Sequence, residues 1–230
     1  MSDEPDSVRS GETYPDVAGH SDRIAVAKKY EPGCEIVKWG GADRAYEEME
    51  PFLDVRQKLR VVDMGAGTGK IGERFKKANP DTHVIGIDLS SKMLETATAM
   101  GRINEAHVGD VTKMGIVEKG TSDAVTSAGV LDFIEDPKAF VANSARALKP
   151  GGVLSITFEP IKTKFHGHKT IRHDEASMRA LFKEHGFRIV REVRDPNIYT
   201  NTFVNKEQGG APVENVILVG VLENTPENTL

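Results

Sequence analysis

The feature that most constrains this chain is a glycine-rich turn between an apolar run and a helical pattern. Residues 61–69 read VVDMGAGTG, so a buried strand is followed at once by three glycines at alternate positions. Glycine adopts positive φ angles and has no Cβ, so such a turn can be tight and can let a ligand approach the backbone. Asp88 stands twenty-one residues after Gly67, at the end of the next expected strand. An acid in that place can accept hydrogen bonds from a ribose diol.

From residue 57 to residue 224 the sequence alternates between strand-like and helix-like patterns, which we interpret as one α/β domain. Strands separated by helices form right-handed βαβ units and a mainly parallel sheet with helices on both faces. No helical pattern separates the last two strands, so we expect an antiparallel C-terminal hairpin in which one edge strand runs antiparallel. The seven expected strands cover residues 60–64, 83–87, 103–108, 123–127, 153–158, 187–194 and 214–222.

Capping residues mark several helix boundaries. Asp136, followed by Pro137, predicts a helix start, and that helix should end at the turn 149–152. A last helix is expected from Asp174 to His185. Ser90 should cap an earlier helix. The inner face of that helix would carry Met93, Leu94, Ala97 and Met100.

Two shorter segments precede this domain. Residues 1–20 are rich in Ser, Asp, Glu, Gly and Pro, and we expect them to form a flexible N-terminal segment. Residues 21–56 carry two short helical patterns on either side of the Gly40-Gly41 pair. We expect them to form an N-terminal helical cap beside the sheet.

Charge and cysteine content limit the expected partners. The chain has 30 Lys and Arg against 35 Asp and Glu, a net charge of −5, whereas nucleic-acid-binding proteins usually carry a basic surface. The stretch 162–173 is the one candidate basic patch. A single cysteine, Cys34, permits no intrachain disulfide and suits a reducing compartment. With no signal peptide or membrane-spanning run, we expect a cytoplasmic protein, monomer or homodimer, without nucleic-acid or membrane partners.

The glycine pattern is compatible with two kinds of ligand, NAD and a nucleoside that carries a cationic tail. The NAD fingerprint needs a glycine three places after its second glycine, where this chain has Lys70, and Gly69 comes one step early. A pyrophosphate would also meet the negative charge of Asp63. A cationic amino-acid tail would instead be stabilised by that carboxylate. A tight turn without any ligand is the remaining alternative.

These residues resemble the motifs of the class I S-adenosylmethionine-dependent methyltransferases. Residues 63–69 are similar to the first motif of that family, an acid followed by x-G-x-G-x-G, and Asp88 matches its ribose-binding acid. Residues 109–111, 122–131 and 149–152 resemble later motifs, in order and in phase over about residues 55–222. The resemblance implies a Rossmann-like fold, S-adenosyl-L-methionine as the cofactor and methyl transfer as the activity.

The resemblance also implies a set of cofactor-binding residues. The glycines would line the methionine portion, Asp63 would help to place its ammonium group, and Ser127 would lie close to the sulfonium carbon. The residues leave alternatives open: Asp88 as a helix cap, Asp110 as a turn residue, and Ser127 as a serine bonded only to backbone. The full set is Asp63, Gly65, Ala66, Gly67, Gly69, Asp88, Leu89, Gly109, Asp110, Val111 and Ser127.

The acceptor should bind beyond the carboxyl ends of the strands, where ligands of this fold class lie. Candidates for its wall are Tyr30, Trp39, Leu131, Asp132, Phe133, Glu159, His166, His168, His173, Asn197 and Tyr199. Of these, His166, His168, Glu159 and Asp132 are the catalytic candidates. The alternatives are ordinary packing of the cap for Tyr30 and Trp39, a flexible polar loop for the histidines, and surface placement for Glu159 and Asp132. No cysteine or acid completes a zinc spacing with the histidines, so we expect no metal.

The acceptor itself is predicted by elimination. The nucleic-acid amino-methylating branch of the family carries an Asn/Asp-Pro-Pro-aromatic stretch after the fourth strand, where this chain reads Ser127-Ala128-Gly129-Val130. The paired glutamates of the protein-arginine branch are also missing. We therefore expect methylation of an oxygen or nitrogen atom, and as a third choice carbon, of a small metabolite. The alternatives are a protein or RNA acceptor, a cofactor-binding module without methyl transfer, or another enzyme on this fold.

Overall fold

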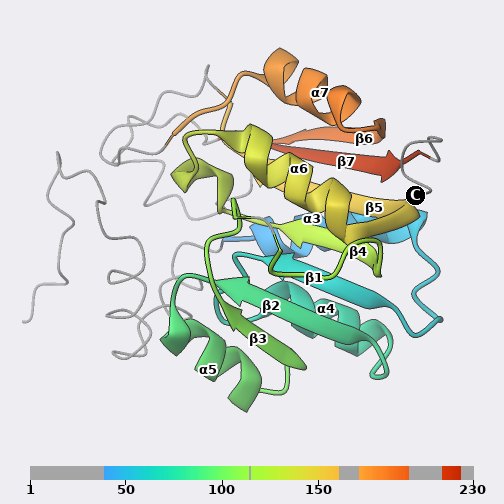
Figure 1. The fold of residues 1–230 in the computed structure, drawn as a ribbon, viewed down its shortest axis with the longest axis vertical. Coiled ribbons are helices and arrows are strands. Elements are labelled where there is room, and N and C mark those ends of the chain that lie inside the picture. Colours follow the sequence, from blue (N-terminus) through green and yellow to red (C-terminus); the bar gives the residue numbers. More distant parts are fainter. Residues whose placement is uncertain (1–38, 114, 161–170, 197–213, 224–230) are drawn as a thin grey trace, which may run out of the picture.

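Seven strands form one sheet in the order β3-β2-β1-β4-β5-β7-β6 in the computed structural model (Figure 1). The structure describes residues 39–113, 115–160, 171–196 and 214–223. Each expected strand is present, within a few residues of its expected ends. The strands are β1 Arg60–Met64, β2 His83–Asp88, β3 Glu105–Val108, β4 Ser122–Ser127, β5 Leu148–Phe158, β6 Phe187–Asp195 and β7 Asn215–Leu222.

The sheet is parallel from β3 to β5 and becomes antiparallel at β7. This confirms the mainly parallel Rossmann-like sheet with a C-terminal hairpin. The position of the reversed strand differs from the prediction, because β7 lies between β5 and β6 and pairs antiparallel with both (Figure 1). The edge strand β6 therefore runs in the same direction as β5. Both faces and both edges of β7 are covered, which agrees with its apolar sequence.

Helices cover both faces of the sheet, as expected. The helices α3, α4 and α5 bury their apolar residues with Val61 and Ala124 in one cluster. The helices α6 and α7 pack on the other face with Val62 and Met64. The elements are α3 Gly41–Met49, η1 Glu50–Phe52, α4 Lys70–Ala78, α5 Ser91–Ala99, η2 Leu131–Phe133, α6 Pro137–Ala147 and α7 Glu175–Glu184.

The capping residues act as predicted, with one error on the inner face of α5. The side chains of Ser90, Asp136 and Asp174 accept hydrogen bonds from backbone N–H groups in the first turns of α5, α6 and α7. Met100, expected to face inward, is 50% exposed because α5 ends at Ala99. The strand β5 begins earlier than expected, at Leu148, which pairs with Ser122 before a register shift.

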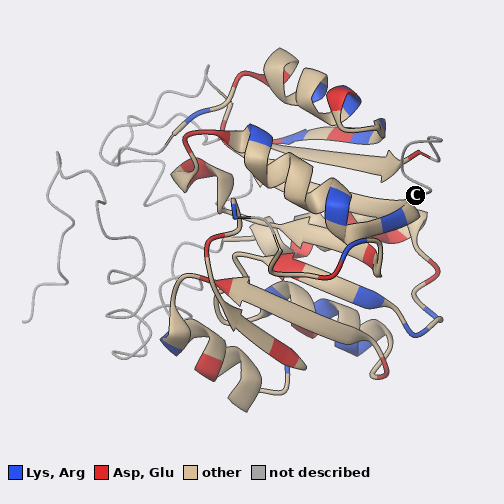
Figure 2. Ribbon diagram, in the orientation of Figure 1, with Lys and Arg blue, Asp and Glu red and all other residues tan. Residues whose placement is uncertain are grey.

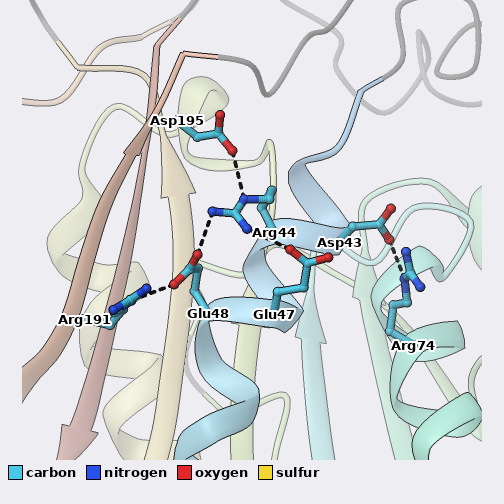
Figure 3. A network of polar contacts seen from close by, with 7 residues as sticks. All are labelled: Asp43, Arg44, Glu47, Glu48, Arg74, Arg191 and Asp195. Atoms are coloured by element: carbon cyan, nitrogen blue, oxygen red, sulfur yellow. Dashed lines mark hydrogen bonds and ion pairs between the residues drawn. The ribbon is translucent and has the colours of Figure 1, made fainter.

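Charged side chains fix the position of α3 on the sheet (Figure 3). Arg44 donates from Nε to Asp195 at the end of β6 (2.9 Å) and from Nη2 to Glu48 (2.6 Å). Glu48 also accepts from Arg191 of β6 (2.7 Å) and is buried. On the other side of α3, Asp43 pairs with Arg74 of α4. The helix that belongs to the expected N-terminal cap is therefore joined to both α4 and the C-terminal hairpin.

Within the described ranges, none of the helices combines the length and apolarity that crossing a lipid bilayer requires.

Candidate functional site

The glycine loop connects β1 to α4 with three residues at positive φ: 78° at Gly65, 52° at Gly67 and 78° at Gly69. The N–H groups of Gly65 and Ala66 both donate to the carbonyl of Ile87, at 2.7 and 2.9 Å. A Cβ atom on Gly65 would overlap the side chain of Val130, which follows β4. The loop therefore needs glycine both for its backbone angles and for its close packing.

Asp88 fastens this loop to the end of β2. Its Oδ2 accepts from the N–H of Gly67 at 2.8 Å, and its Oδ1 accepts from the N–H of Ser90 at 2.9 Å. Ser90, and not Asp88, is the N-cap of α5, since the Ser90 hydroxyl accepts from Met93. These two bonds join the residues that follow β1 and β2, and the ribose role of Asp88 stays a prediction. Sequence patterns did not indicate the bond to Gly67.

Asp63 is buried at the centre of the site, with 1% of its surface exposed. Neither oxygen of its carboxylate has a hydrogen-bond partner among the described residues. Burial, together with the negative charge of Asp88, raises the pKa of Asp63 to about 8. A buried acid without a partner is the arrangement that a cationic group would satisfy. The pocket beside it is lined by Trp39, Ala42, Asp63, Gly65, Ala66, Thr68, Lys70, Ile71 and Ala128.

Trp39 borders this pocket. A Cβ atom on Gly41 would lie 2.5 Å from Cζ2 of the indole, and one on Gly129 would lie 3.0 Å from the same atom. The ring is therefore held between the start of α3 and the segment after β4. Trp39 thus packs against the cap helix and also lines the pocket, and its contact with a cofactor stays a prediction.

Arg102 supports the loop from the segment after α5, and sequence reasoning missed it. The side chain is 7% exposed, and its Nη1 donates to the carbonyl of Thr68 at 3.0 Å. Its Nη2 lies 3.4 Å from Glu73 Oε2 of α4. Its own Cβ lies 2.9 Å from where a Cβ on Gly69 would stand. No sequence signal indicates this role, because Thr68 lies far earlier in the chain.

The remaining predicted cofactor residues differ in how they are engaged. Asp110 accepts from the N–H and the hydroxyl of Thr112, at 2.9 and 2.7 Å, which is the turn role left open by the sequence. Ser127 is buried and donates from Oγ to the carbonyl of Met64 at 2.6 Å, which is its backbone alternative. Leu89 is 44% exposed beside Asp88, and Val111 is buried. Gly109 donates its N–H to the carbonyl of Asp88 at 2.9 Å, which joins the segments that follow β2 and β3.

Two of the catalytic candidates lie together at the carboxyl ends of β4 and β5. The backbone N–H of Glu159 donates to Asp132 Oδ1 at 3.0 Å. Both side chains are buried, at 7% exposure for Asp132 and 3% for Glu159. Burial, with the negative charge of Glu159, raises the pKa of Asp132 to about 7. One of the two acids can therefore hold a proton near neutral pH.

The segment 171–173 crosses this pair of acids. Ile171 donates its N–H to the carbonyl of Asp132 (2.8 Å), and His173 donates its N–H to that of Glu159 (3.2 Å). His173 Nε2 lies 2.9 Å from the carbonyl of Leu131, so this ring stabilises the turn. Arg172 Nε lies 3.7 Å from Glu159 Oε2, which places one guanidinium beside two carboxylates. Sequence reasoning had placed Arg172 only in a basic stretch.

Other predicted wall residues are exposed or lie outside the described residues. Phe133 of η2 is 44% exposed. Among the residues that the structure describes, no group of three or more His, Cys, Asp or Glu side chains could hold a metal ion. Tyr30, His166, His168, Asn197 and Tyr199 all lie outside the described residues.

Part of the chain matches known methyltransferases. Residues 62–156 match the family model described as a methyltransferase domain. A malonyl-[acyl-carrier protein] O-methyltransferase of Hahella chejuensis is 31% identical over 121 residues, 49% of this chain and 43% of that protein. A tRNA 5-carboxymethoxyuridine methyltransferase of Escherichia coli is 28% identical over 146 residues, 61% of this chain and 51% of that protein. The chain thus spans about half the length of these relatives.

A solved structure supports the same fold. In the complex between the Haloferax volcanii Trm112 methyltransferase activator and a methyltransferase, one chain superposes with a TM-score of 0.71 and 21% identity. The match covers 91% of this chain and 98% of that chain. Together with the order of the motifs and the strand order of the sheet, these matches support a class I, Rossmann-like methyltransferase domain over residues 62–156, with S-adenosylmethionine as its cofactor.

Proposed function

We propose that this chain transfers a methyl group from S-adenosylmethionine to an oxygen or nitrogen atom, and as a third choice carbon, of a small metabolite. One observation carries the cofactor part of this proposal. The glycine loop borders a pocket in which the buried carboxylate of Asp63 has no hydrogen-bond partner among the described residues. A ligand with an ammonium group supplies the charge that this carboxylate lacks.

The residues around the loop would hold and orient the cofactor, whose sulfonium supplies an activated methyl group. Asp88 would accept from the ribose hydroxyls while it holds Gly67, with Leu89 beside it against the adenine. Asp110 and Val111 would contact the adenine edge. Ser127 donates its hydroxyl to Met64, so we assign it to the shape of the loop and not to direct bonding. Positioning of this kind accounts for much of the barrier reduction in group transfer.

Asp132 is our choice for the group that accepts a proton from the acceptor. Its pKa of about 7 suits a general base near neutral pH, and Arg172 Nε lies 3.7 Å from Oε2 of the neighbouring Glu159. The bound cofactor would supply the methyl group to the acceptor atom, and Asp132 would take up the proton that the acceptor loses. Asp132 lies in η2, directly after the segment 128–130, and in that segment Val130 lies against Gly65 and Gly129 lies against Trp39.

The charge at the carboxyl edge of the sheet favours a small acceptor. Asp63, Asp88, Asp110, Asp132 and Glu159 lie in or directly after β1 to β5. Figure 2 shows acidic residues along the edge where these strands end. Asp110, whose pKa is lowered, would be ionised there and would repel a phosphate-rich polymer, whereas an amine or a neutral hydroxyl compound would not be repelled.

A macromolecular acceptor is the second candidate, favoured by the tRNA methyltransferase named among the relatives. The two candidates are separated by methyl-labelled S-adenosylmethionine incubated with cell extract that has been divided by dialysis. We expect label in the small-molecule fraction. Label found only in the retained protein and RNA would contradict the proposed acceptor class.

A variant at Asp88 tests the cofactor assignment itself. Asp88→Ala removes the acceptor for the ribose and for Gly67, so we expect the affinity for S-adenosylhomocysteine to fall by about 1.5–3 kcal/mol in calorimetry. Asp81→Ala, at an exposed acid in the turn before β2, is the matched control and should bind like the parent protein. Unchanged affinity in Asp88→Ala would remove its ribose role.

A further inference from the structure

The pocket between Trp39 and the glycine loop is lined by an acid that is 1% exposed. Asp63 lies inside the sheet, paired with Gly86 of β2 and Thr126 of β4. The hydroxyl of Thr126, like both oxygens of Asp63, has no hydrogen-bond partner within the described ranges. An isolated carboxylate in such a place is costly to ionise, so burial favours its protonated form.

The charged groups around Asp63 come from two neighbouring elements. Asp88, at the end of β2, adds negative charge and is already bonded to Gly67 and Ser90. Lys70, at the start of α4, lines the same pocket but makes no hydrogen bond to Asp63. Trp39 and Ala42 beside α3, and Ala128 after β4, contribute no charge. The balance favours the neutral acid, in agreement with the pKa of about 8.

We propose that Asp63 is a neutral carboxylic acid in the cofactor-free protein and releases its proton when the ammonium group of the cofactor's amino-acid tail enters the pocket. This inference rests on the proposed function, because it takes S-adenosylmethionine as the ligand. The exchange is balanced: the tail keeps its positive charge, the proton goes to solvent, and a buried ion pair replaces a buried neutral acid. The pocket therefore discriminates by charge, because a nucleoside without the tail cannot drive the exchange.

This exchange makes cofactor affinity depend on pH. Below the pKa of Asp63, each unit of pH lowers the ionised fraction about tenfold, and the affinity for a ligand with the tail falls in proportion. We therefore expect binding to strengthen by up to about tenfold per unit between pH 6 and pH 8, and to level off above pH 8. Trp39 is the only tryptophan in the chain and borders the pocket, so its fluorescence should follow the same curve.

Calorimetry with two ligands tests the proposal on the unmodified protein. S-adenosylhomocysteine carries the amino-acid tail, whereas 5′-methylthioadenosine has the same nucleoside and sulfur without it. Each is titrated at pH 7 in phosphate and in Tris, whose different heats of ionisation reveal the number of protons released. We expect S-adenosylhomocysteine to release close to one proton more than 5′-methylthioadenosine does.

Variants assign the proton to Asp63. In Asp63→Asn, S-adenosylhomocysteine should bind more weakly, with the extra proton release and the pH dependence both lost. Asp81→Asn, the exposed acid before β2, should keep both. Equal proton release by the two ligands, or release that persists in Asp63→Asn, overturns the inference and leaves the cofactor assignment standing. Failure of S-adenosylhomocysteine and S-adenosylmethionine to bind at all overturns both.

Discussion

At the scale of single residues, glycines with similar backbone angles have different surroundings. Gly65 and Gly101 have φ angles of 78° and 68°. At Gly65 a side chain would meet Val130, whereas nothing lies within 4 Å of a Cβ atom on Gly101. The strain of a left-handed angle is common to both, and the steric conflict belongs to Gly65 alone.

Alanine substitutions at Gly65 and Gly101 separate the cost of backbone strain from the cost of a steric conflict. Gly101→Ala should destabilise the protein by about 1–2 kcal/mol, which is the cost of a left-handed residue with a side chain. Gly65→Ala should cost more, because Val130 must also move, and it should weaken S-adenosylhomocysteine binding. Urea unfolding and calorimetry measure the two effects. Equal losses of stability would show that Val130 yields without cost.

The buried acid Asp63 should make stability depend on pH without any ligand. Its pKa of about 8 in the folded protein exceeds the value of about 3.9 for an unfolded aspartate. The folded state therefore binds the proton more tightly, and stability falls as pH rises from about 4 to about 8. Relative to the parent protein, Asp63→Asn should gain up to about 1.4 kcal/mol per unit between pH 5 and pH 8.

Asp110→Asn is the control for this measurement. Burial opposes ionisation of Asp110, but hydrogen bonds from Thr112 and the charge of Lys113 outweigh it, and its pKa is lowered. Asp110 is therefore ionised in both states above pH 5, and its replacement should shift stability by the same amount at pH 5 and pH 8. A flat difference for Asp63→Asn would contradict the ionisation assigned to Asp63.

At the scale of elements, the helices begin where short polar side chains accept backbone N–H groups. Asp136 shows this for α6, where its Oδ1 accepts from the N–H of Lys138 at 2.9 Å and Pro137 follows as the first helical residue. That local pattern is readable from sequence because donor and acceptor lie two residues apart. Substitution of the cap residue Asp136 therefore measures how much the cap contributes to the stability of the protein.

Asp136→Ala should lower the free energy of unfolding by about 1 kcal/mol, because a first-turn N–H loses its acceptor. Glu135→Ala, at the exposed residue directly before the cap, should change stability by less than about 0.5 kcal/mol. Chemical denaturation at neutral pH measures both. If the two variants were equally stable, the cap would have no energetic role.

At the scale of the whole molecule, α3 is joined to the last hairpin by ion pairs that span most of the chain. Glu48 accepts from Arg44 in the same helix and from Arg191 in β6 (Figure 3). Its side chain is 8% exposed, while that of Glu47 is 53% exposed and, in the part of the chain that the structure describes, forms an ion pair with Arg44 alone. The two adjacent glutamates therefore differ in burial, and Glu48 bonds to a distant strand whereas Glu47 bonds within its own helix.

Glu48→Ala should destabilise the protein by about 1–3 kcal/mol, since two arginines lose their buried acceptor. The loss should include looser binding of S-adenosylhomocysteine, because α3 contributes to the pocket of Asp63. Glu47→Ala should cost less than about 0.5 kcal/mol, as is usual for exposed ion pairs. Thermal unfolding measures the stability of both variants, and calorimetry measures their affinity for S-adenosylhomocysteine. Equal stability and equal affinity of the two variants would exclude a role for Glu48 in joining α3 to β6.

The sequence by itself determined the strands and helices, the helix caps and the glycine loop with its partner acid. These features depend on residues a few positions apart or on apolar periodicity, so the pattern of side chains is enough to predict them. It also determined which family the motifs resemble, and with it the cofactor.

The tertiary structure alone decided which distant residues meet. The placement of β7 between β5 and β6, the hold of Arg102 on Thr68, and the meeting of Asp132 with Glu159 all depend on chain segments packing across the sheet. Burial is likewise a property of the whole fold. Asp63 and Asp88 are both aspartates close to the ends of strand-like segments, and the sequence does not show that their burial differs. Only the packed sheet buries Asp63 and leaves it without a hydrogen-bond partner among the described residues, and that burial raises its pKa.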